Sequence, residues 1–204
     1  KGVYRPALPA GAVGAPLVVN VTGTSGLLAP PYSLGGTLQV AGRAPLPGQG
    51  VLYDLQLAGT ATRTLVLGSG STALIENNVT SPPRFARGIG QVHVAYDVGG
   101  TGLVRCARAD GSLLTIHTAP PGTSITDLAW SETTSRLLVV QAVGAVETLL
   151  IVDPSGGTTA VSGTPAAAFR EGITVQADGS FLIRTVGPAS TLVKVRPLTG
   201  VASQ

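Results

Sequence analysis

The sequence is poor in charged residues, in aromatic residues and in sulfur. Only 11% of its 204 residues are Asp, Glu, Lys or Arg, only 4% are aromatic, and it holds one Cys and no Met. Globular proteins are on average about one quarter charged, so this composition is unusually neutral. One Cys cannot pair within the chain, and 44% hydrophobic residues exclude the low-hydrophobicity signature of disorder.

Long hydrophobic runs and clustered charge are also missing. The best apolar stretches, such as 136–140 and 148–152, have the length of strands, so we expect no transmembrane segment. The 13 basic residues are scattered, and the closest groups are Arg84 with Arg87 and Arg105 with Arg108. Nucleic-acid binding needs a basic stripe with interleaved aromatic residues, and it is therefore not expected.

The start of the sequence bears on localisation. It begins at Lys1 rather than Met, which is typical of a mature or excised segment. Near-absence of cysteine is compatible with an exported bacterial protein. We therefore predict an extracytoplasmic location, in the periplasm, at the cell surface or secreted.

Glycine and proline are abundant, with 28 and 15 residues, and they punctuate short runs rich in Val, Leu, Ile and Thr. Such runs between turn signals predict strands and an all-β protein, with one short helical turn expected at 166–170. Three of these runs lead into a polar turn, at 103–112, 149–157 and 192–200. Their first leucines are 46 and 43 residues apart.

Further elements repeat in phase with these runs. The run 136–140 corresponds to 180–184, 44 residues later, and the preceding runs 125–130 and 172–176 also correspond. One unit therefore contains four short strands in about 43 residues, which is the size of a β-propeller blade. A blade cannot bury both faces of its sheet alone, so neighbouring blades stabilise one another.

Two segments, TLLIVDPSGG at 148–157 and GITVQADGSFLI at 172–183, resemble the YncE, NHL and SMP-30-like bacterial propellers. The resemblance covers about residues 88–204 and implies a β-propeller fold. For SMP-30-like hydrolases and lactonases it also implies a divalent cation held by Glu, Asn and Asp side chains at the mouth of the channel. The matching motifs are missing from this chain, so no metal ligand is assigned.

Residues 1–87 fit the repeat less well than residues 88–204. Strands are predicted at 16–21, 36–40, 51–57, 64–67 and 72–76, with a hairpin around 68–70 and Pro-rich loops at 27–32 and 43–49. We interpret 1–204 as one all-β domain of four to five blades. Three arrangements of these blades are open: a closed ring, a part of a longer propeller, or an array completed by another chain. The alternative is a β-sandwich or jelly roll.

The two histidines are the first candidates for chemistry. Strand alternation places His93, Ala95 and Asp97 on one face, with about 13 Å between His93 and Asp97 along a straight strand. One strand therefore cannot bring both to the same metal ion. His117 is predicted to share a face with Leu113 and Thr115.

The sequence around the single cysteine allows two interpretations, an activated thiol and a buried, inert one. Cys106 lies beside Arg105 and near Arg108, and adjacent cations can activate a thiol. Alternation, however, places Cys106 with Val104 on the predicted core face. A buried, inert thiol is the favoured interpretation.

No nucleophile, phosphate-loop or dinucleotide motif occurs, and a triad of Ser112, His117 and Asp110 has no specific support. The acidic candidates are Asp127, Asp153 and Asp178, predicted at blade turns, and the dense group Glu76-Asn77-Asn78. Asp-Pro and Asp-Gly turns explain Asp153 and Asp178 as structural. We assign no catalytic, cofactor-binding or metal residue and expect no cofactor.

Two further patterns are present. Asn20-Val-Thr22 and Asn78-Val-Thr80 match the acceptor pattern for N-glycosylation, which matters only in a eukaryotic secretory source.

The leading functional hypothesis is a non-enzymatic extracytoplasmic binding or structural module in a surface or multi-protein assembly. It rests on the absence of catalytic motifs and on a charge-poor surface, which indicates a covered face and hence a protein partner or self-association. The alternatives are a metal-dependent lactonase or hydrolase of the SMP-30-like type and a virion or filament structural protein with a sandwich fold.

Overall fold

The fold was analysed in a computed structural model of the chain. It describes residues 79–108, 112–164, 169, 172–186 and 190–203 in full, and the backbone of the strands at 3–4, 17–18, 38–46, 50–57, 63–68 and 72–78. The predicted loop at 27–32 and nearly all of the predicted helical turn at 166–170 lie outside the described residues.

The described part of the chain consists of strands, turns and short irregular connections. The strands are β1 (Val3–Tyr4), β2 (Leu17–Val18), β3 (Leu38–Leu46), β4 (Gly50–Leu57), β5 (Arg63–Gly68), β6 (Thr72–Val79), β7 (Arg84–Gly88), β8 (Gln91–Val98), β9 (Thr101–Arg108), β10 (Leu113–Thr118), β11 (Ser124–Ser131), β12 (Arg136–Val143), β13 (Val146–Val152), β14 (Thr158–Ala160), β15 (Thr174–Val175), β16 (Phe181–Arg184), β17 (Leu192–Arg196) and β18 (Val201–Ser203).

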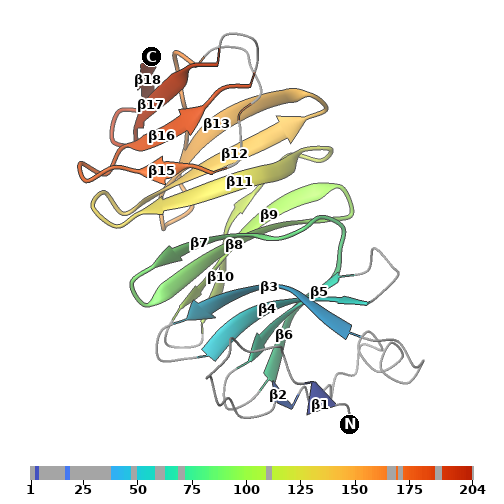
Figure 1. Cartoon of the computed structure of the whole chain (residues 1–204). Coiled ribbons are helices and arrows are strands. Elements are labelled where there is room, and N and C mark those ends of the chain that lie inside the picture. Colours follow the sequence, from blue (N-terminus) through green and yellow to red (C-terminus); the bar gives the residue numbers. More distant parts are fainter. Residues whose placement is uncertain are drawn as a thin grey trace.

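From β3 onward, consecutive strands pair in antiparallel meanders of four. We name these blade 1 (β3–β6), blade 2 (β7–β10), blade 3 (β11–β14) and blade 4 (β15–β18). Blades 1 and 2 are joined at a single pair of residues, Val79 and Val98, so they remain two separate meanders. Figure 1 shows the four sheets stacked in chain order, with blade 4 at the opposite end from the short β1–β2 pair.

This arrangement confirms the all-β, propeller-like prediction over the described residues, because a sandwich would have two facing sheets. The three runs that define the sequence repeat form the third strand of blades 2, 3 and 4. The segment 43–49 was expected to be a loop, but β3 continues through Pro45 to Leu46. A proline is tolerated there because β3 lies at the edge of its sheet, where one side of the strand needs no donor.

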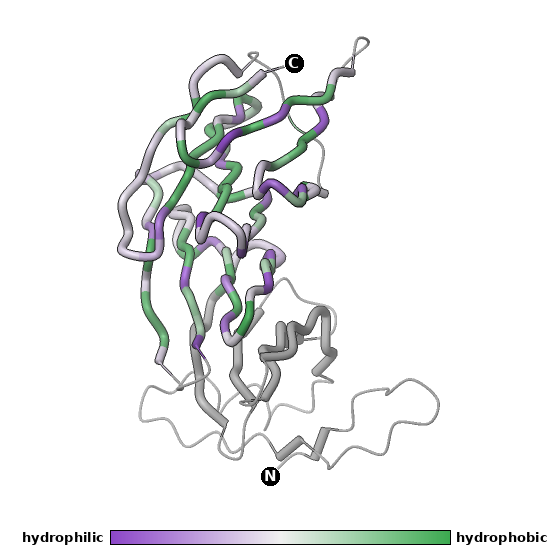
Figure 2. Tube along the Cα trace, turned by 90° about the vertical axis from the view of Figure 1, so that its left-hand side faces the viewer, coloured by the Kyte–Doolittle hydropathy of each residue, from purple (hydrophilic) through white to green (hydrophobic). Residues whose placement is uncertain are grey.

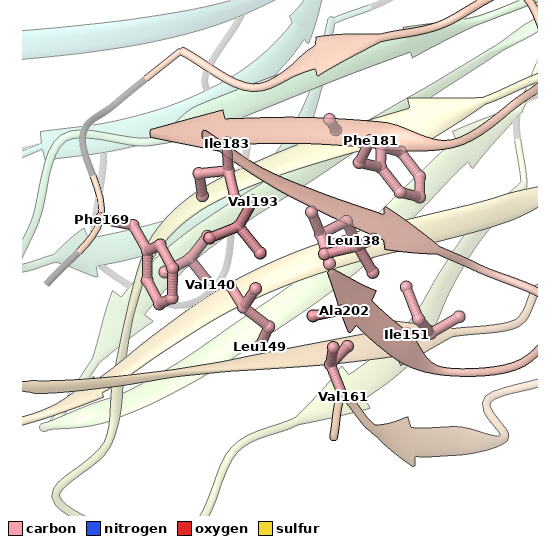
Figure 3. Close-up of a cluster of buried hydrophobic side chains, with 12 residues drawn as sticks. Leu138, Val140, Leu149, Ile151, Val161, Phe169, Phe181, Ile183, Val193 and Ala202 are labelled. Atoms are coloured by element: carbon pink, nitrogen blue, oxygen red, sulfur yellow. The ribbon is translucent and has the colours of Figure 1, made fainter. Parts of the chain in front are cut away.

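Apolar side chains are packed between successive blades. Ala95, Val104 and Cys106 of blade 2 meet Ile125 and Trp130 of blade 3 in one buried cluster. A second cluster joins blade 3 to blade 4, where Phe181, Ile183 and Val193 face Leu138 and Val140 (Figure 3). Both faces of the central strands are covered, so burial is nearly continuous along β8 and β12. Figure 2 shows hydrophobic stretches along the trace that hydrophilic residues interrupt.

The other face of blade 2 carries a third cluster, which contains Val92, Val94 and Tyr96. Strand β8 of this blade contacts β3 and β6, so this face is turned to blade 1. The first strands of consecutive blades also meet, because β11 contacts both β7 and β15. The stacking therefore brings the beginnings of blades 2, 3 and 4 close together.

Candidate functional site

A cavity of about 310 Å³ lies where blades 2 and 3 meet. Ser81 and Pro82 of the connection into blade 2 line it, together with the start of β11 and with Phe169 in the connection into blade 4. It therefore lies on the side of the stack where the chain passes from one blade to the next. Its polar lining includes Arg84, Asp97, Thr126, Asp127 and Glu147.

The carboxylates of this region are held by backbone N–H groups of neighbouring blades. The N–H of Ile125, at the start of blade 3, donates to Asp97 Oδ1 of blade 2 at 3.2 Å. Glu147 of blade 3 accepts from the Phe169 N–H through Oε2 and from the Thr126 hydroxyl through Oε1, the latter at 2.8 Å. These bonds fix the positions of the two carboxylates and connect the blades.

Asp127 was predicted at a blade turn, and the structure corrects this. It lies within β11, where the register with β12 shifts between Ile125 and Asp127. A bulge re-aims the side chain, so Asp127 Oδ1 accepts from the Leu128 N–H at 2.8 Å and Oδ2 from the Gly172 N–H at 2.9 Å. The carboxylate thereby ties blade 3 to the segment that leads into blade 4.

The described part of the chain contains six carboxylate side chains, and each accepts a backbone N–H. Four of these bonds connect one blade with another or with the connection into blade 4. The acceptors are Asp97, Asp127, Glu132, Glu147, Asp153 and Asp178. All six described carboxylates therefore act as hydrogen-bond acceptors that hold the backbone in place.

His93 lies in the interface between blades 2 and 3. It shares a face with Ala95 and Asp97, as predicted, and its ring stacks on the Trp130 indole with centroids 4.5 Å apart. The residue is 1% exposed, and neither ring nitrogen has a hydrogen-bond partner among the described residues. Burial, reinforced by the charge of Arg108, lowers the pKa of His93 to about 4, so the ring is neutral at pH 7.

The prediction for His117 was wrong. The register of β10 against β9 shifts between Thr115 and His117, which places His117 opposite Val104. Val104 belongs to the cluster between blades 2 and 3, whereas Leu113 packs against the opposite face of blade 2. Burial lowers the pKa of His117, and a hydrogen bond with Gln141 opposes this shift.

Cys106 is a free, buried cysteine on the same face as Val104, which confirms its predicted placement. Its thiol contacts the side-chain oxygen of Gln91 at 3.5 Å. Burial on this face keeps the sulfur away from solvent. Its inertness stays a prediction.

Asp153 and Asp178 lie in turns, as predicted. Asp153 Oδ1 accepts from the Ser155 N–H at 2.7 Å, and Asp178 Oδ1 accepts from the Ser180 N–H at 3.0 Å. The Ser155 hydroxyl, with this N–H, lowers the pKa of Asp153. Lys194, which bonds Asp178 Oδ2 at 2.8 Å, lowers the pKa of Asp178 well below its usual range, with help from Ser180.

The remaining candidates do not form a site in the described residues. Asp110 and Asn20, together with the side chains of Glu76, Asn77 and Asn78, lie outside them, and Thr80 bonds the carbonyl of Asp97. Within the described ranges, no three His, Cys, Asp or Glu side chains come together in an arrangement that could hold a metal ion.

Sequence reasoning named Arg84, Asp97 and Asp127 but did not bring them together, and it missed Glu147 and Phe169. Glu147 and Phe169 lie far from Arg84 and Asp97 in the sequence, and only blade stacking brings them together. The shared signal is weak, namely that Ser81, Arg84 and Ser124 occur at or near the start of a blade. No spacing within one strand could have indicated the cavity.

Within the described part of the chain, no helix is long and apolar enough to cross a membrane. No protein-family model matches the sequence, and no curated protein is similar to it. The fold, by contrast, has many solved neighbours. They include the puromycin-hydrolyzing peptidase of Mycobacterium tuberculosis, with a TM-score of 0.55, 15% identity and 82% of this chain covered.

Two other neighbours are lactonase-like. The periplasmic gluconolactonase of Pseudomonas aeruginosa matches with a TM-score of 0.51 and 16% identity over 82% of this chain. A candidate 6-phosphogluconolactonase of Bacteroides fragilis matches with a TM-score of 0.53 and 18% identity over 81% of this chain. The likeness extends over 53% of each lactonase-like chain and 31% of the peptidase. At such identities the likeness establishes the β-propeller type of fold and nothing finer.

Proposed function

We propose that the chain is a non-enzymatic binding module built from propeller blades, with the cavity between blades 2 and 3 as its ligand site. One observation carries this proposal. Every described carboxylate is engaged with a backbone N–H, including the three that line the cavity. The cavity therefore offers fixed polar groups for recognition, and its size is at the lower end of the range for small-molecule pockets, about 300–1,000 Å³.

Small polyhydroxylated molecules are the ligand class to test first, because carboxylates, a guanidinium and hydroxyls bind hydroxyl groups well. The experiment is a titration of the full chain with aldoses and aldonates, followed by ligand-observed NMR and calorimetry at millimolar concentrations. We expect saturable binding that Thr126→Val weakens and that the exposed variant Thr158→Val leaves unchanged. The absence of saturable binding by any polar probe would overturn the proposal.

The module is also proposed to take part in an assembly through the outer face of blade 4, the face turned away from blade 3. Phe181 and Ile183 point to blade 3, so alternation places Leu182 and Arg184 on the outer face. Leu192, 60% exposed, and Lys194 join them from β17. By the sequence repeat, these four correspond to Leu138, Val140, Leu149 and Ile151, all of which blade 4 buries.

The proposed occupant of this outer face is the blade 1 end of a second copy of the chain. The likeness extends over 53% of each lactonase-like neighbour, so two copies supply about the length of one such protein. Sedimentation equilibrium tests this. We expect concentration-dependent association that Leu192→Asp abolishes and that Val143→Asp, at the exposed end of β12 in blade 3, leaves intact. A chain that stays monomeric at high concentration would overturn the assembly.

An extracytoplasmic location is part of the same proposal. It is supported by the near-absence of cysteine and by the periplasmic location in the name of the Pseudomonas neighbour. Fractionation of the source cells tests this location, because the chain should be recovered in the periplasmic or secreted fraction.

A second candidate function is a hydrolase of the lactonase type, in keeping with the predicted resemblance to SMP-30-like propellers. The lactonase-like neighbours favour it. The described residues do not assemble a metal site, so the reacting groups would come from elsewhere in the molecule. A pH-stat assay with gluconolactone, with and without divalent cations, separates the two candidates: turnover above the spontaneous rate supports the hydrolase.

A further inference from the structure

Both histidines of the chain lie in the interface between blades 2 and 3. The chain has only two, His93 and His117. His93 of β8 stacks on Trp130 of β11 with the ring centroids 4.5 Å apart. His117 of β10 lies opposite Val104, on the face of blade 2 that is turned to blade 3, and its ring bonds Gln141 of β12. The side chains that gain charge in mild acid are therefore gathered in one of the layers between blades.

The surroundings of His93 offer no partner for a protonated ring. Burial lowers the pKa of His93 to about 4, and the positive charge of Arg108 contributes. The charged and titratable side chains that the packed elements turn toward this interface are Arg84 of β7, Asp97 of β8, Cys106 and Arg108 of β9, His117 of β10 and Glu132 after β11. Among the described residues, none of these bonds a ring nitrogen of His93.

Acid acts in the same direction on the polar links between the two blades. The Ile125 N–H of blade 3 donates to Asp97 Oδ1 at 3.2 Å, and the Ile89 N–H of blade 2 donates to Glu132 Oε1. Ile89 and Asp97 lie near opposite ends of β8, so the two links hold the interface at both ends. Protonation of a carboxylate weakens its link, because an ionised acceptor makes the stronger hydrogen bond. Protonation of His93 places an unpaired charge in an apolar layer.

We propose that the layer between blades 2 and 3 is an acid-sensitive hinge, at which protonation of His93 and His117 separates the two blades. Blades 3 and 4 stay packed, because the buried cluster between them consists of hydrophobic residues. Packed faces are either in contact or apart, so the change is between two states. Separation uncovers Trp130 and Cys106 and alters the cavity between the same blades. The inference goes beyond the proposed function, because it holds whatever ligand the cavity takes.

The chain carries its own probes for this opening. It has one Trp and one Cys, and both are buried in the cluster between blades 2 and 3. The experiment measures acrylamide quenching of Trp130 and labelling of Cys106 by dithiodipyridine in the full chain at pH 7 and pH 5, with labelling normalised to free cysteine. Titration of His93 alone should raise the accessible fraction about 20-fold. The open state binds the proton with the ordinary pKa of 6.5, and the closed state with a pKa of about 4.

His93→Phe keeps an aromatic ring against Trp130 and cannot be protonated. It should remove most of the rise in Cys106 labelling, and His117→Phe should remove a smaller part. A thiol on the other face of β11 tests the neighbouring layer. Ala129 packs into the cluster shared with blade 4, so Ala129→Cys combined with Cys106→Ala places the single thiol there. This thiol should stay protected at pH 5.

A rise at Cys106 with protection at position 129 would support the hinge. An equal rise at both positions would show that the whole chain unfolds, and it would overturn the hinge. Unchanged labelling of Cys106 at pH 5, or a rise that His93→Phe does not reduce, would also overturn it. If Ala129→Cys does not fold, amide exchange in β16 and β17 at pH 5 gives the comparison, and loss of protection there would count against the hinge. Failure of the sugar titrations would leave this result intact, since no ligand is used.

Discussion

His93 and Trp130 stack across the interface between blades 2 and 3, and both carry polar atoms that the interface leaves unpaired. An unpaired buried polar group costs free energy, and the aromatic overlap offsets part of that cost. The neutral imidazole is tolerated because burial lowers the pKa of His93 to about 4. Protonation of this ring therefore opposes the packing of the two blades.

The first prediction is that the chain loses stability in mild acid. The pKa of His93 falls from 6.5 in the unfolded chain to about 4 in the folded one, so the unfolded chain binds the proton more readily. The stabilisation is complete above pH 6.5 and decreases as the pH falls from 6.5 to 4, by about 3 kcal/mol in all. Urea unfolding at a series of pH values measures it.

His93→Phe is the matched variant, since it keeps an aromatic ring against Trp130 and removes the titration. We expect its unfolding free energy at pH 7 to be equal or higher, and its slope between pH 4 and 6.5 to be smaller. The pKa of His117 is also lowered by burial. The slope of His117→Phe therefore measures how much of the pH dependence comes from this second histidine. An unchanged slope in His93→Phe would contradict the assignment.

Gly88, at the end of β7, allows the close approach of Trp130 to the blade 2 backbone. A Cβ at this position would lie 2.6 Å from Glu132 Oε1 and 2.8 Å from Trp130 Nε1. We predict that Gly88→Ala destabilises the chain by about 1–3 kcal/mol through overpacking. Thermal unfolding measures this, with Val143→Ala at the exposed end of β12 as a control. A neutral Gly88→Ala variant would show that the indole can move away.

Bulges decide where side chains point at the scale of single strands. In β11 the bulge between Ile125 and Asp127 turns the carboxylate toward Gly172, and in β10 the shift after Thr115 re-aims His117. Both strands lie at the interface of blades 2 and 3. The irregular register therefore sets the connections between blades, and regular alternation does not predict it.

Asp127→Ala should loosen the junction of blades 3 and 4. It removes the hydrogen bond from the Gly172 N–H, and because this bond is exposed to solvent we expect a loss of about 0.5–1.5 kcal/mol. Amide exchange should rise first in blade 4 and in its connection. Asp153→Ala is the control. Apart from a contact with Arg136, the hydrogen bonds of Asp153 stay within one turn, so this variant should increase amide exchange only locally. Uniform loosening of all blades by Asp127→Ala would contradict this role.

At the scale of the whole molecule, stability comes from the layers between blades. Each blade is a thin sheet, and the buried clusters lie between neighbours, as Figure 3 shows for blades 3 and 4. Such arrays are stabilised by nearest-neighbour interfaces. Damage to one interface should therefore act on the two blades that share it.

Phe181→Ala tests this dependence. The side chain is fully buried between blades 3 and 4, so we expect a loss of about 3–5 kcal/mol in unfolding free energy. Limited proteolysis should then cleave blade 4 before blades 2 and 3. Leu114→Ala, at a half-exposed position in blade 2, should change stability by no more than about 0.5 kcal/mol.

The sequence by itself indicated the main strands of blades 3 and 4 and the third strand of blade 2, whereas β7 at Arg84–Gly88 was not predicted. Turn residues, often Gly or Pro, separate the strands, apolar and β-branched runs fill them, and the recurrence of Leu103, Leu149 and Leu192 marks one strand per blade. These are local signals, read within a few residues. Regular alternation likewise placed Cys106 in the core and His93 on the face of Asp97.

Only the tertiary structure decided the cavity, the direction of Asp127 and the partner of His93. The cavity combines residues from Ser81 to Phe169, and the stacking of His93 on Trp130 joins two blades. The physical reason is that blade-to-blade contacts depend on sheet twist, bulges and packing, which act across long sequence separations. A period of about 43 residues specifies a blade, and only the packed neighbours specify what its side chains touch.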